Sequence, residues 1–255
     1  MLPTLIQDEE FAVIKLNRPE ALNALSFEII DALSNLIDQV SKMPVRALLV
    51  LGAGDKAFCA GADIKELMGR DQQAQKLGAQ RGQRMMQKIT ELPIPSVALI
   101  GGYAFGGGLE LAMACTFRLA SPKAKMGLPE IKLGLIPGYG GTQRLARLIG
   151  EARAQEMILS GATIDAEVAD RWGLVNAIIQ GDLISEGKAF ARRFTGYSLP
   201  ILSYAKEAVQ RSLDNPVVEG LRIEADLSTL AFQTHDAHEG MTAFAEKRQA
   251  RFKDR

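Results

Sequence analysis

The chain has 255 residues, of which 47% are hydrophobic and 24% are charged. This composition fits one large globular domain or two small ones and excludes an intrinsically disordered chain. Lys and Arg number 30 and are balanced by 30 Asp and Glu. Because the net charge is zero, no global field attracts nucleic acid or an anionic membrane, and an anionic ligand needs a local site.

Two residue types limit the chemistry that the chain can perform. Cys59 and Cys115 lie in apolar sequence, which predicts buried thiols in a reducing compartment, with a reactive cysteine as the alternative. His235 and His238 are the only histidines, and both lie in the polar run 234–239. A solvated helix start explains them better than a metal site, because no third ligand is evident. With so few histidines, carboxylates are expected to transfer protons.

No part of the sequence is typical of a targeting or membrane-spanning segment. Residues 1–10 lack the pattern of a secretory signal or an Arg-rich transit peptide. The longest apolar runs, such as residues 47–51 and 97–100, are far shorter than the roughly 20 residues that span a bilayer. We therefore expect a soluble, cytoplasmic protein that binds neither membrane nor nucleic acid.

Short apolar or β-branched runs alternate with helical patterns along most of the chain. Buried strands are predicted at Phe11–Leu16, Ala47–Leu51, Ser96–Ile100, Thr116–Ala120 and Leu174–Ile179. Ser26 is predicted to cap a helix that ends before Pro44, and a more polar helix is predicted over Arg70–Leu92. Because crossover helices connect parallel neighbours, this alternation predicts an α/β fold with largely parallel strands.

The last part of the chain has a different character. From Ser185 onward only helical periodicity is present, with a break at Asp214-Asn215-Pro216. No repeat or long linker interrupts the chain, so a single domain with a helical extension is the economical description. Apolar positions such as Leu227, Leu230 and Phe232 predict contacts between subunits. Packing of the tail on its own core would look identical in sequence.

Two segments rich in small residues offer backbone donors. The first, residues 56–66, follows a strand that ends in Gly and Asp residues, and its small side chains let a ligand approach the backbone. An ordinary strand-to-helix turn explains it equally well. The second, residues 101–112, places a glycine cluster before an apolar helix, whose free amides form a positive pole. Neither nucleotide-binding glycine motif is present, so an amide donor for a developing oxyanion remains.

Two acids lie in similar apolar surroundings. Glu110 stands one turn inside the glycine-led helix between Leu109 and Leu111, which predicts a desolvated carboxyl with a raised pKa. A solvated helix face is the alternative. Glu130 lies in the apolar, glycine-rich segment 126–145, where a rigid loop is the alternative. Two such acids together with two sets of backbone donors indicate a functional site more specifically than the acids or the donors do alone.

These segments together resemble the crotonase superfamily, also called the enoyl-CoA hydratase/isomerase family. The resemblance begins at residues 16–25 (LNRPEALNAL) and closes at residues 238–248 (HEGMTAFAEKR). It implies an α/β crotonase fold, which is a ClpP-like spiral of ββα units with a C-terminal helical extension. Residues 1–195 then form the spiral core with the CoA site and active site, and residues 196–255 form a helical oligomerisation region.

The resemblance assigns roles position by position. The backbone amides of Ala62 and Gly107 match those that form the oxyanion hole around a thioester carbonyl. Glu110 and Glu130 match the paired glutamates of hydratases, and Gly138 matches a glycine beside the catalytic water. The implied CoA contacts are Ala24, Ala60, Asp63 and Ile64 for adenine and pantetheine, Lys65 near the nucleotide, and Lys247 toward the CoA phosphates of a neighbouring subunit.

The paired glutamates imply reversible syn addition of water to a trans-2-enoyl-CoA, which gives a 3-hydroxyacyl-CoA. CoA arrives as part of the substrate, so no metal or other cofactor is expected. Gly101 departs from the Asn that relatives usually have, but it leaves Gly107 and Glu110 in place. The resemblance also implies a homotrimer or homohexamer that acts in fatty-acid metabolism by β-oxidation. The acyl chain length stays open, as do phenylacetate and branched amino-acid breakdown.

Two other functions fit the same resemblance. A Δ3,Δ2-enoyl-CoA isomerase, or another acyl-CoA enzyme of the family, could use the same two glutamates to move a proton between carbons. A non-catalytic relative that binds RNA is more remote, because the net charge of zero offers no broad basic surface. Retention of both acids also argues against the RNA-binding alternative.

Overall fold

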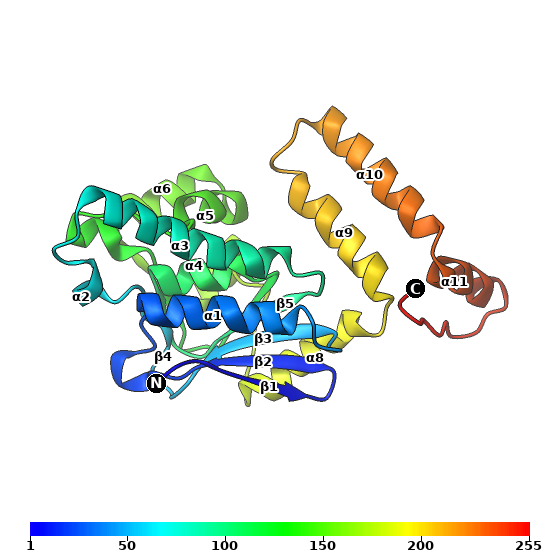
Figure 1. Cartoon of the computed structure of the whole chain (residues 1–255), viewed down its shortest axis with the longest axis horizontal. Coiled ribbons are helices and arrows are strands. Elements are labelled where there is room, and N and C mark those ends of the chain that lie inside the picture. The colour runs from blue at the N-terminus through cyan, green and yellow to red at the C-terminus, as the bar shows by residue number, and fades with distance from the viewer. The chain divides into compact units, whose positions relative to one another are not determined.

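The computed structural model describes residues 1–255, which form two compact units. The first unit comprises residues 1–92 and 96–190, and the second comprises residues 93–95 and 191–255. All the strands belong to the first unit, whereas the second is helical (Figure 1). The boundary between the two falls inside helix α8 (Leu183–Thr195).

The larger sheet has six strands in the order β1-β2-β3-β5-β7-β10. All neighbouring pairs from β2 onward are parallel, and β1 alone runs antiparallel to β2. This arrangement confirms the largely parallel α/β fold that the sequence predicts. The strands are β1 (Thr4–Asp8), β2 (Phe11–Leu16), β3 (Ala47–Gly52), β5 (Ser96–Ile100), β7 (Phe117–Ala120) and β10 (Ala177–Ile178).

The predicted strands agree with the structure except at the last one. Only Ala177–Ile178 of the predicted run Leu174–Ile179 forms a strand. The backbone N–H of Leu174 instead donates to the Ala169 carbonyl at 2.8 Å, in the turn that ends helix α7 (Ala166–Trp172). The prediction was therefore too long because apolar sequence alone does not distinguish a buried turn from a strand.

Helices α1 (Phe27–Val40) and α3 (Gln72–Glu91) pack against each other in the first unit (Figure 1). Ser26 caps α1 as predicted, because its Oγ accepts the backbone N–H of Ile29 at 3.2 Å. The buried stripe of α1 repeats at helical spacing. It consists of Ile29, Ile30, Leu33, Ile37 and Val40.

A second, smaller sheet was not predicted and is decisive for the site. Its order is β4-β6-β8-β9, with β4, β6 and β8 parallel and β9 antiparallel. Each strand has three residues, which is too short for a period-2 pattern to be recognised. The strands are β4 (Ala57–Cys59), β6 (Tyr103–Phe105), β8 (Lys125–Gly127) and β9 (Thr163–Asp165).

The two sheets alternate along the chain and so generate ββα units. A strand of the larger sheet is followed by one of the smaller sheet and then by a helix, as in β5, β6 and α4 (Gly107–Ala114). After β4 the chain forms α2 (Ile64–Leu67), and after β8 it forms the 3-10 helix η2 (Pro129–Leu133). Helices α5 (Gly141–Ile149) and α6 (Glu151–Ser160) follow η2. The carboxyl ends of β4, β6 and β8 therefore lie along one edge of the small sheet.

The second unit contains the helices predicted for the tail. Helices α9 (Leu199–Arg211) and α10 (Val217–Phe232) lie side by side, and the predicted break at residues 214–216 separates them (Figure 1). Helix α11 (His235–Ala245) follows, with Thr234 as its N-cap. Both histidines lie exposed in this helix, which confirms the solvated helix start. No helix in the chain combines the length and apolarity that a membrane crossing requires.

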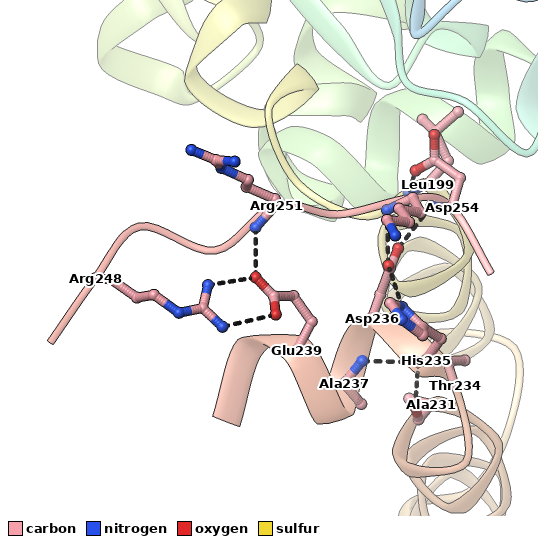
Figure 2. A network of polar contacts seen from close by, with 11 residues as sticks. Leu199, Ala231, Thr234, His235, Asp236, Ala237, Glu239, Arg248, Arg251 and Asp254 are labelled. Carbon is pink, nitrogen blue, oxygen red and sulfur yellow. Dashed lines mark hydrogen bonds and ion pairs between the residues drawn. The ribbon is translucent and has the colours of Figure 1, made fainter. Parts of the chain in front are cut away.

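Two carboxylates of α11 hold the end of the chain (Figure 2). Asp236, only 1% exposed, accepts the backbone N–H groups of Lys253 at 2.7 Å and Asp254 at 2.8 Å. Glu239 accepts two N–H bonds from the Arg248 guanidinium, at 2.7 and 2.9 Å. Residues after α11 are thus held to this helix by charge-assisted hydrogen bonds.

Candidate active site

The sequence segments singled out for their small residues and acids meet at the carboxyl edge of the small sheet. Because β4, β6 and β8 are parallel neighbours, the residues that follow them are brought together. They border a cleft of about 180 Å³. Its lining includes Ala60, Ala62, Ile64, Gly107, Glu110, Glu130, Gly138 and Tyr139.

The backbone amide of Ala62 is free to bind a ligand. Ala62 forms an isolated parallel bridge with Leu25. In this bridge the carbonyl of Gly61 accepts the Leu25 N–H at 2.7 Å, and Asp63 N–H donates to the Leu25 carbonyl at 2.9 Å. Since the flanking residues make both bonds, the N–H of Ala62 points to the opposite side and donates to no acceptor in the chain.

The backbone amide of Gly107 offers a second donor. Gly107 is the first residue of α4, where helical N–H groups have no partner within the helix. The preceding Gly106 has φ 48° and ψ −126°, a conformation that favours glycine. A Cβ placed on Gly107 would lie 3.3 Å from the Ala62 nitrogen. The two amides are therefore neighbours, as an oxyanion hole requires.

Glu110 is held rigidly inside the protein. It is 1% exposed, and its Oε1 accepts the backbone N–H of Tyr139 at 2.8 Å and that of Gly141 at 2.6 Å. Burial raises the pKa of Glu110 to about 7, the bond from Gly141 opposes this rise, and the nearby Glu130 charge adds to it. This confirms the desolvated carboxyl predicted from the sequence and excludes a solvated helix face.

Glu130 stands at the start of η2, beside the same cleft. Its Oε2 is buried and has no hydrogen-bond partner in the chain. Burial raises the pKa of Glu130 as well. A Cβ on Gly106 would lie 2.8 Å from Glu130 Oε1, so the glycine turn before α4 makes room for this carboxyl. An unpartnered buried carboxyl oxygen is suited to exchange a proton with a bound molecule.

Tyr139 and Gly141 were not assigned roles from the sequence, yet their amides position Glu110. Gly141 is the first residue of α5, so the Glu110 carboxylate lies at the positive end of a helix. Arg144 of the same helix also lowers the pKa of Glu110, although less than Gly141 does. The only sequence signal for these contacts was the glycine-rich run before α5.

The remaining predicted positions divide into two groups. Ala60, Ile64 and Gly138 border the cleft, and the Gly138 carbonyl accepts the side chain of Gln83 at 2.9 Å. The others do not border it. These are Ala24, Asp63 and Lys65 in the first unit, and Lys247 after α11 in the second.

Asp63 has a structural partner that the sequence did not indicate. Its carboxylate lies 2.7 Å from Arg18 and also accepts the backbone N–H of Lys65 at 3.2 Å. The hydrogen bond from Arg18 lowers the pKa of Asp63. Asn23, buried and at φ 58°, holds the same region through bonds from its side-chain amide to the Ala57 and Ala53 carbonyls. These contacts fix the chain around Ala24 and β4.

Cys59 is not placed to act as a nucleophile. Its thiol is buried, and burial raises its pKa to about 12. Cys115 is buried too, and the two form no disulfide. The prediction of buried thiols is confirmed. Glu110 and Glu130 are the two carboxyls that border the cleft.

Comparisons with known proteins show what this chain is similar to. A family model described as "Enoyl-CoA hydratase/isomerase" matches residues 7–255. The probable enoyl-CoA hydratase of Rhizobium meliloti is 44% identical over 248 residues, which cover 95% of this chain and 94% of that protein. The crotonyl-CoA hydratase of Syntrophomonas wolfei is 40% identical over 251 residues, covering 97% and 96%. The crystal structure of an enoyl-CoA hydratase from Bacillus anthracis matches with a TM-score of 0.94 at 36% identity, covering 99% of each chain.

The spiral of ββα units, with this cleft at the carboxyl edge of the small sheet, places the protein in the crotonase class of α/β proteins. The chain belongs to the enoyl-CoA hydratase/isomerase family. Both the family and the fold class expected from the sequence are thus confirmed.

Proposed function

We propose that the protein is an enoyl-CoA hydratase, a hydro-lyase that adds water reversibly to trans-2-enoyl-CoA to give 3-hydroxyacyl-CoA. One observation carries this proposal. The buried carboxyl of Glu110 and the half-buried Glu130, whose Oε2 is buried without a partner, border the same cleft as the unpartnered amides of Ala62 and Gly107. Relatives that are 40–44% identical over most of the chain carry the name enoyl-CoA hydratase or crotonyl-CoA hydratase.

The amide pair binds the thioester carbonyl of the substrate. As water adds to the β-carbon, negative charge develops on this oxygen, and the N–H groups of Ala62 and Gly107 stabilise the resulting enolate. Each preorganised donor is worth about 3 kcal/mol in such a hole. The donors are backbone groups, so chain path rather than side-chain identity determines their position.

The carboxyl pair positions and activates the water. Tyr139 and Gly141 occupy Oε1 of Glu110, which leaves Oε2 for the nucleophilic water. Ionised Glu110 takes part in activating this water, and Glu130 delivers a proton to the α-carbon through its unpartnered oxygen. Addition of both groups from one carboxyl-lined side gives syn stereochemistry. The two acids form one coupled unit that holds a single proton in the active state.

Substrate binding extends beyond the reacting atoms. Ala60 and Ile64 at the cleft, together with Ala24 and Asp63, contact the adenine and pantetheine of CoA, and Lys65 lies close to the nucleotide. Gly138 lies beside the catalytic water. Lys247 reaches the CoA phosphates of a neighbouring subunit. No metal or further cofactor takes part, since CoA is part of the substrate.

Residues 196–255 assemble the protein into a homotrimer or homohexamer. Exposed apolar side chains in this region, such as Val217 (77%) and Phe232 (68%), support this assignment because apolar surface of this kind favours association. The buried, unpaired thiols are consistent with a reducing cytoplasm. There the enzyme acts in fatty-acid breakdown by β-oxidation.

The test is the loss of the conjugated enoyl-thioester absorbance when the purified protein is mixed with crotonyl-CoA. The product is identified by chromatography as 3-hydroxybutyryl-CoA. Glu110→Gln and Glu130→Gln variants serve as controls and are expected to lose most of this activity. No loss of absorbance in the wild type would overturn the proposal, and double-bond migration in a 3-enoyl-CoA without net hydration would identify an isomerase.

A further inference from the structure

The ring of Tyr139 lies between two glycines that come from different helices. A Cβ built on Gly82 of α3 would overlap Cδ1 of the ring and lie 2.5 Å from Cε1. A Cβ built on Gly107 would lie 3.2 Å from Cδ2 and 3.3 Å from Cε2. Since Cδ1 and Cδ2 are opposite edges of one ring, Gly82 and Gly107 contact Tyr139 from opposite sides.

This arrangement couples α3 to both parts of the catalytic machinery. The Tyr139 ring abuts the residue whose amide forms one half of the candidate oxyanion hole. The Tyr139 backbone N–H holds Glu110 at 2.8 Å. Tyr139 is itself almost fully buried, and its ring is held between Gly82 and Gly107 at one side of the cleft. A push on the ring from α3 is therefore transmitted toward Gly107 or toward the Glu110 contact.

Gly82 has no other evident reason to be glycine. It lies inside a 20-residue helix, and glycine is among the least favourable residues in a helix interior. Its φ is not in the left-handed region. What distinguishes the position is the contact with the Tyr139 ring, where even a methyl group has no room.

We propose that Gly82 is a positioning residue of the active site, which acts through Tyr139 to keep the Gly107 amide and Glu110 in their reactive geometry. This inference rests on the proposed function. If Gly82 acts only by positioning, Gly82→Ala should lower kcat more than it weakens substrate binding, because the added methyl group does not touch the reacting groups. A displacement of about 1 Å at a catalytic centre lowers rates by about a hundredfold.

The experiment compares crotonyl-CoA hydration by wild type, Gly82→Ala, Tyr139→Ala and the double variant. Gly82→Ala is expected to lower kcat by about a hundredfold with KM changed by less than about threefold. Removal of the ring takes away the three atoms nearest to the added methyl group, because all three belong to the ring of Tyr139. The kcat of the double variant is therefore expected to match that of Tyr139→Ala within about twofold, because the effects of substitutions at residues in contact are not additive.

Gly187→Ala in α8 is the matched control. It also places a methyl group on a buried helical glycine, 2.8 Å from the Leu99 side chain and outside the cleft. Thermal unfolding is recorded for every variant. Gly187→Ala is expected to shift the midpoint while leaving kcat unchanged, which separates general crowding from active-site positioning.

A second readout is the pH–rate profile. The Tyr139 N–H bond lowers the pKa of Glu110, so its distortion in Gly82→Ala is expected to move the acid limb of the profile to higher pH. The same acid limb in Gly187→Ala is expected to coincide with that of the wild type.

The outcomes separate the two proposals. An inactive wild type would overturn the hydratase function itself. An active wild type with Gly82→Ala at full kcat, or an equal effect of Gly82→Ala in both backgrounds, would overturn the positioning role alone. If Gly82→Ala does not fold, recovery of the fold in the double variant supports the pairing, and an unfolded double variant contradicts it.

Discussion

The Glu110 carboxylate accepts the backbone N–H of Gly141 at 2.6 Å, and Gly141 is the first residue of α5. Glu110 lies buried in α4, and its carboxylate is stabilised by the amino end of α5. Burial prevails over the hydrogen bonds, because the pKa of Glu110 is raised to about 7. The site therefore contains a carboxyl whose charged form destabilises the fold.

Replacing Glu110 by Gln is expected to stabilise the protein at neutral pH. The carboxyl has a pKa of about 7 in the folded state against 4.5 unfolded, so the free energy of unfolding of the wild type falls as pH rises from 4.5 to 7. The difference corresponds to about 3 kcal/mol. Denaturant unfolding at pH 8 should show Glu110→Gln as more stable by up to this amount.

The pH dependence provides the control for this effect. Below pH 4.5 the wild-type carboxyl is protonated in both states, so the advantage of Glu110→Gln should vanish there. An advantage that persists unchanged at pH 4 would show that the gain comes from packing and not from ionisation.

Glu130→Gln is expected to lower kcat for crotonyl-CoA hydration by about 10³-fold, within the range known for loss of a general acid or base. The amide keeps the shape of the side chain but cannot donate a proton to carbon and regain it. Steady-state kinetics should show KM nearly unchanged, since Glu130 is not an oxyanion donor. Glu156→Gln on the exposed side of α6 is the control and should retain full activity. A variant of Glu130 with wild-type kcat would contradict its role.

Ala62→Pro is expected to reduce kcat by about 10²–10³-fold, because proline removes one of the two N–H donors of the proposed oxyanion hole. No hydrogen bond within the chain is lost, since the Ala62 amide donates to none. Ala62→Gly, which keeps the amide, should stay within a few-fold of wild type. Circular dichroism of the proline variant checks that the fold is kept. Equal activity of the two variants would argue that Gly107 alone stabilises the oxyanion.

The sequence predicted the acids and the small-residue segments of the candidate site but not the geometry that assembles them. Glu110 and Glu130 could be recognised because an acid in an apolar, glycine-rich segment needs a special reason. The small sheet could not, because β4, β6 and β8 have three residues each and pair only through contacts that are distant in sequence. The contact of Gly82 with Tyr139 joins residues 57 positions apart in the chain, and no local pattern encodes it.

Cys59 is expected to resist alkylation in the native protein. Its thiol is buried with a pKa raised to about 12, so almost no thiolate exists at neutral pH. Iodoacetamide labelling followed by mass spectrometry should modify Cys59 only after denaturation. Cys59→Ala is expected to retain hydratase activity. Rapid native labelling together with loss of activity would restore the reactive-cysteine alternative.

Asp236→Asn is expected to loosen the end of the chain. The carboxylate accepts the backbone N–H groups of Lys253 and Asp254. Burial acts to raise the pKa of Asp236, but the hydrogen bonds it accepts, that from Lys253 foremost, together lower it. Loss of one charged acceptor should lower the free energy of unfolding by about 3 kcal/mol.

Hydrogen exchange locates the effect of Asp236→Asn, since the amides of Lys253 and Asp254 should exchange faster while those of β3 keep their relative protection. The exposed Glu246→Gln, which breaks the surface ion pair with Arg248, is the control and should change stability little.

The pH dependence separates charge from packing at Asp236. Because the pKa of Asp236 is lowered in the folded state, its ionised carboxylate stabilises the fold above pH 3.8, which is the unfolded pKa. This contribution is lost as pH falls below 3.8. The difference between wild type and Asp236→Asn should therefore shrink below pH 3.8, and a constant difference would assign the loss to packing instead of charge.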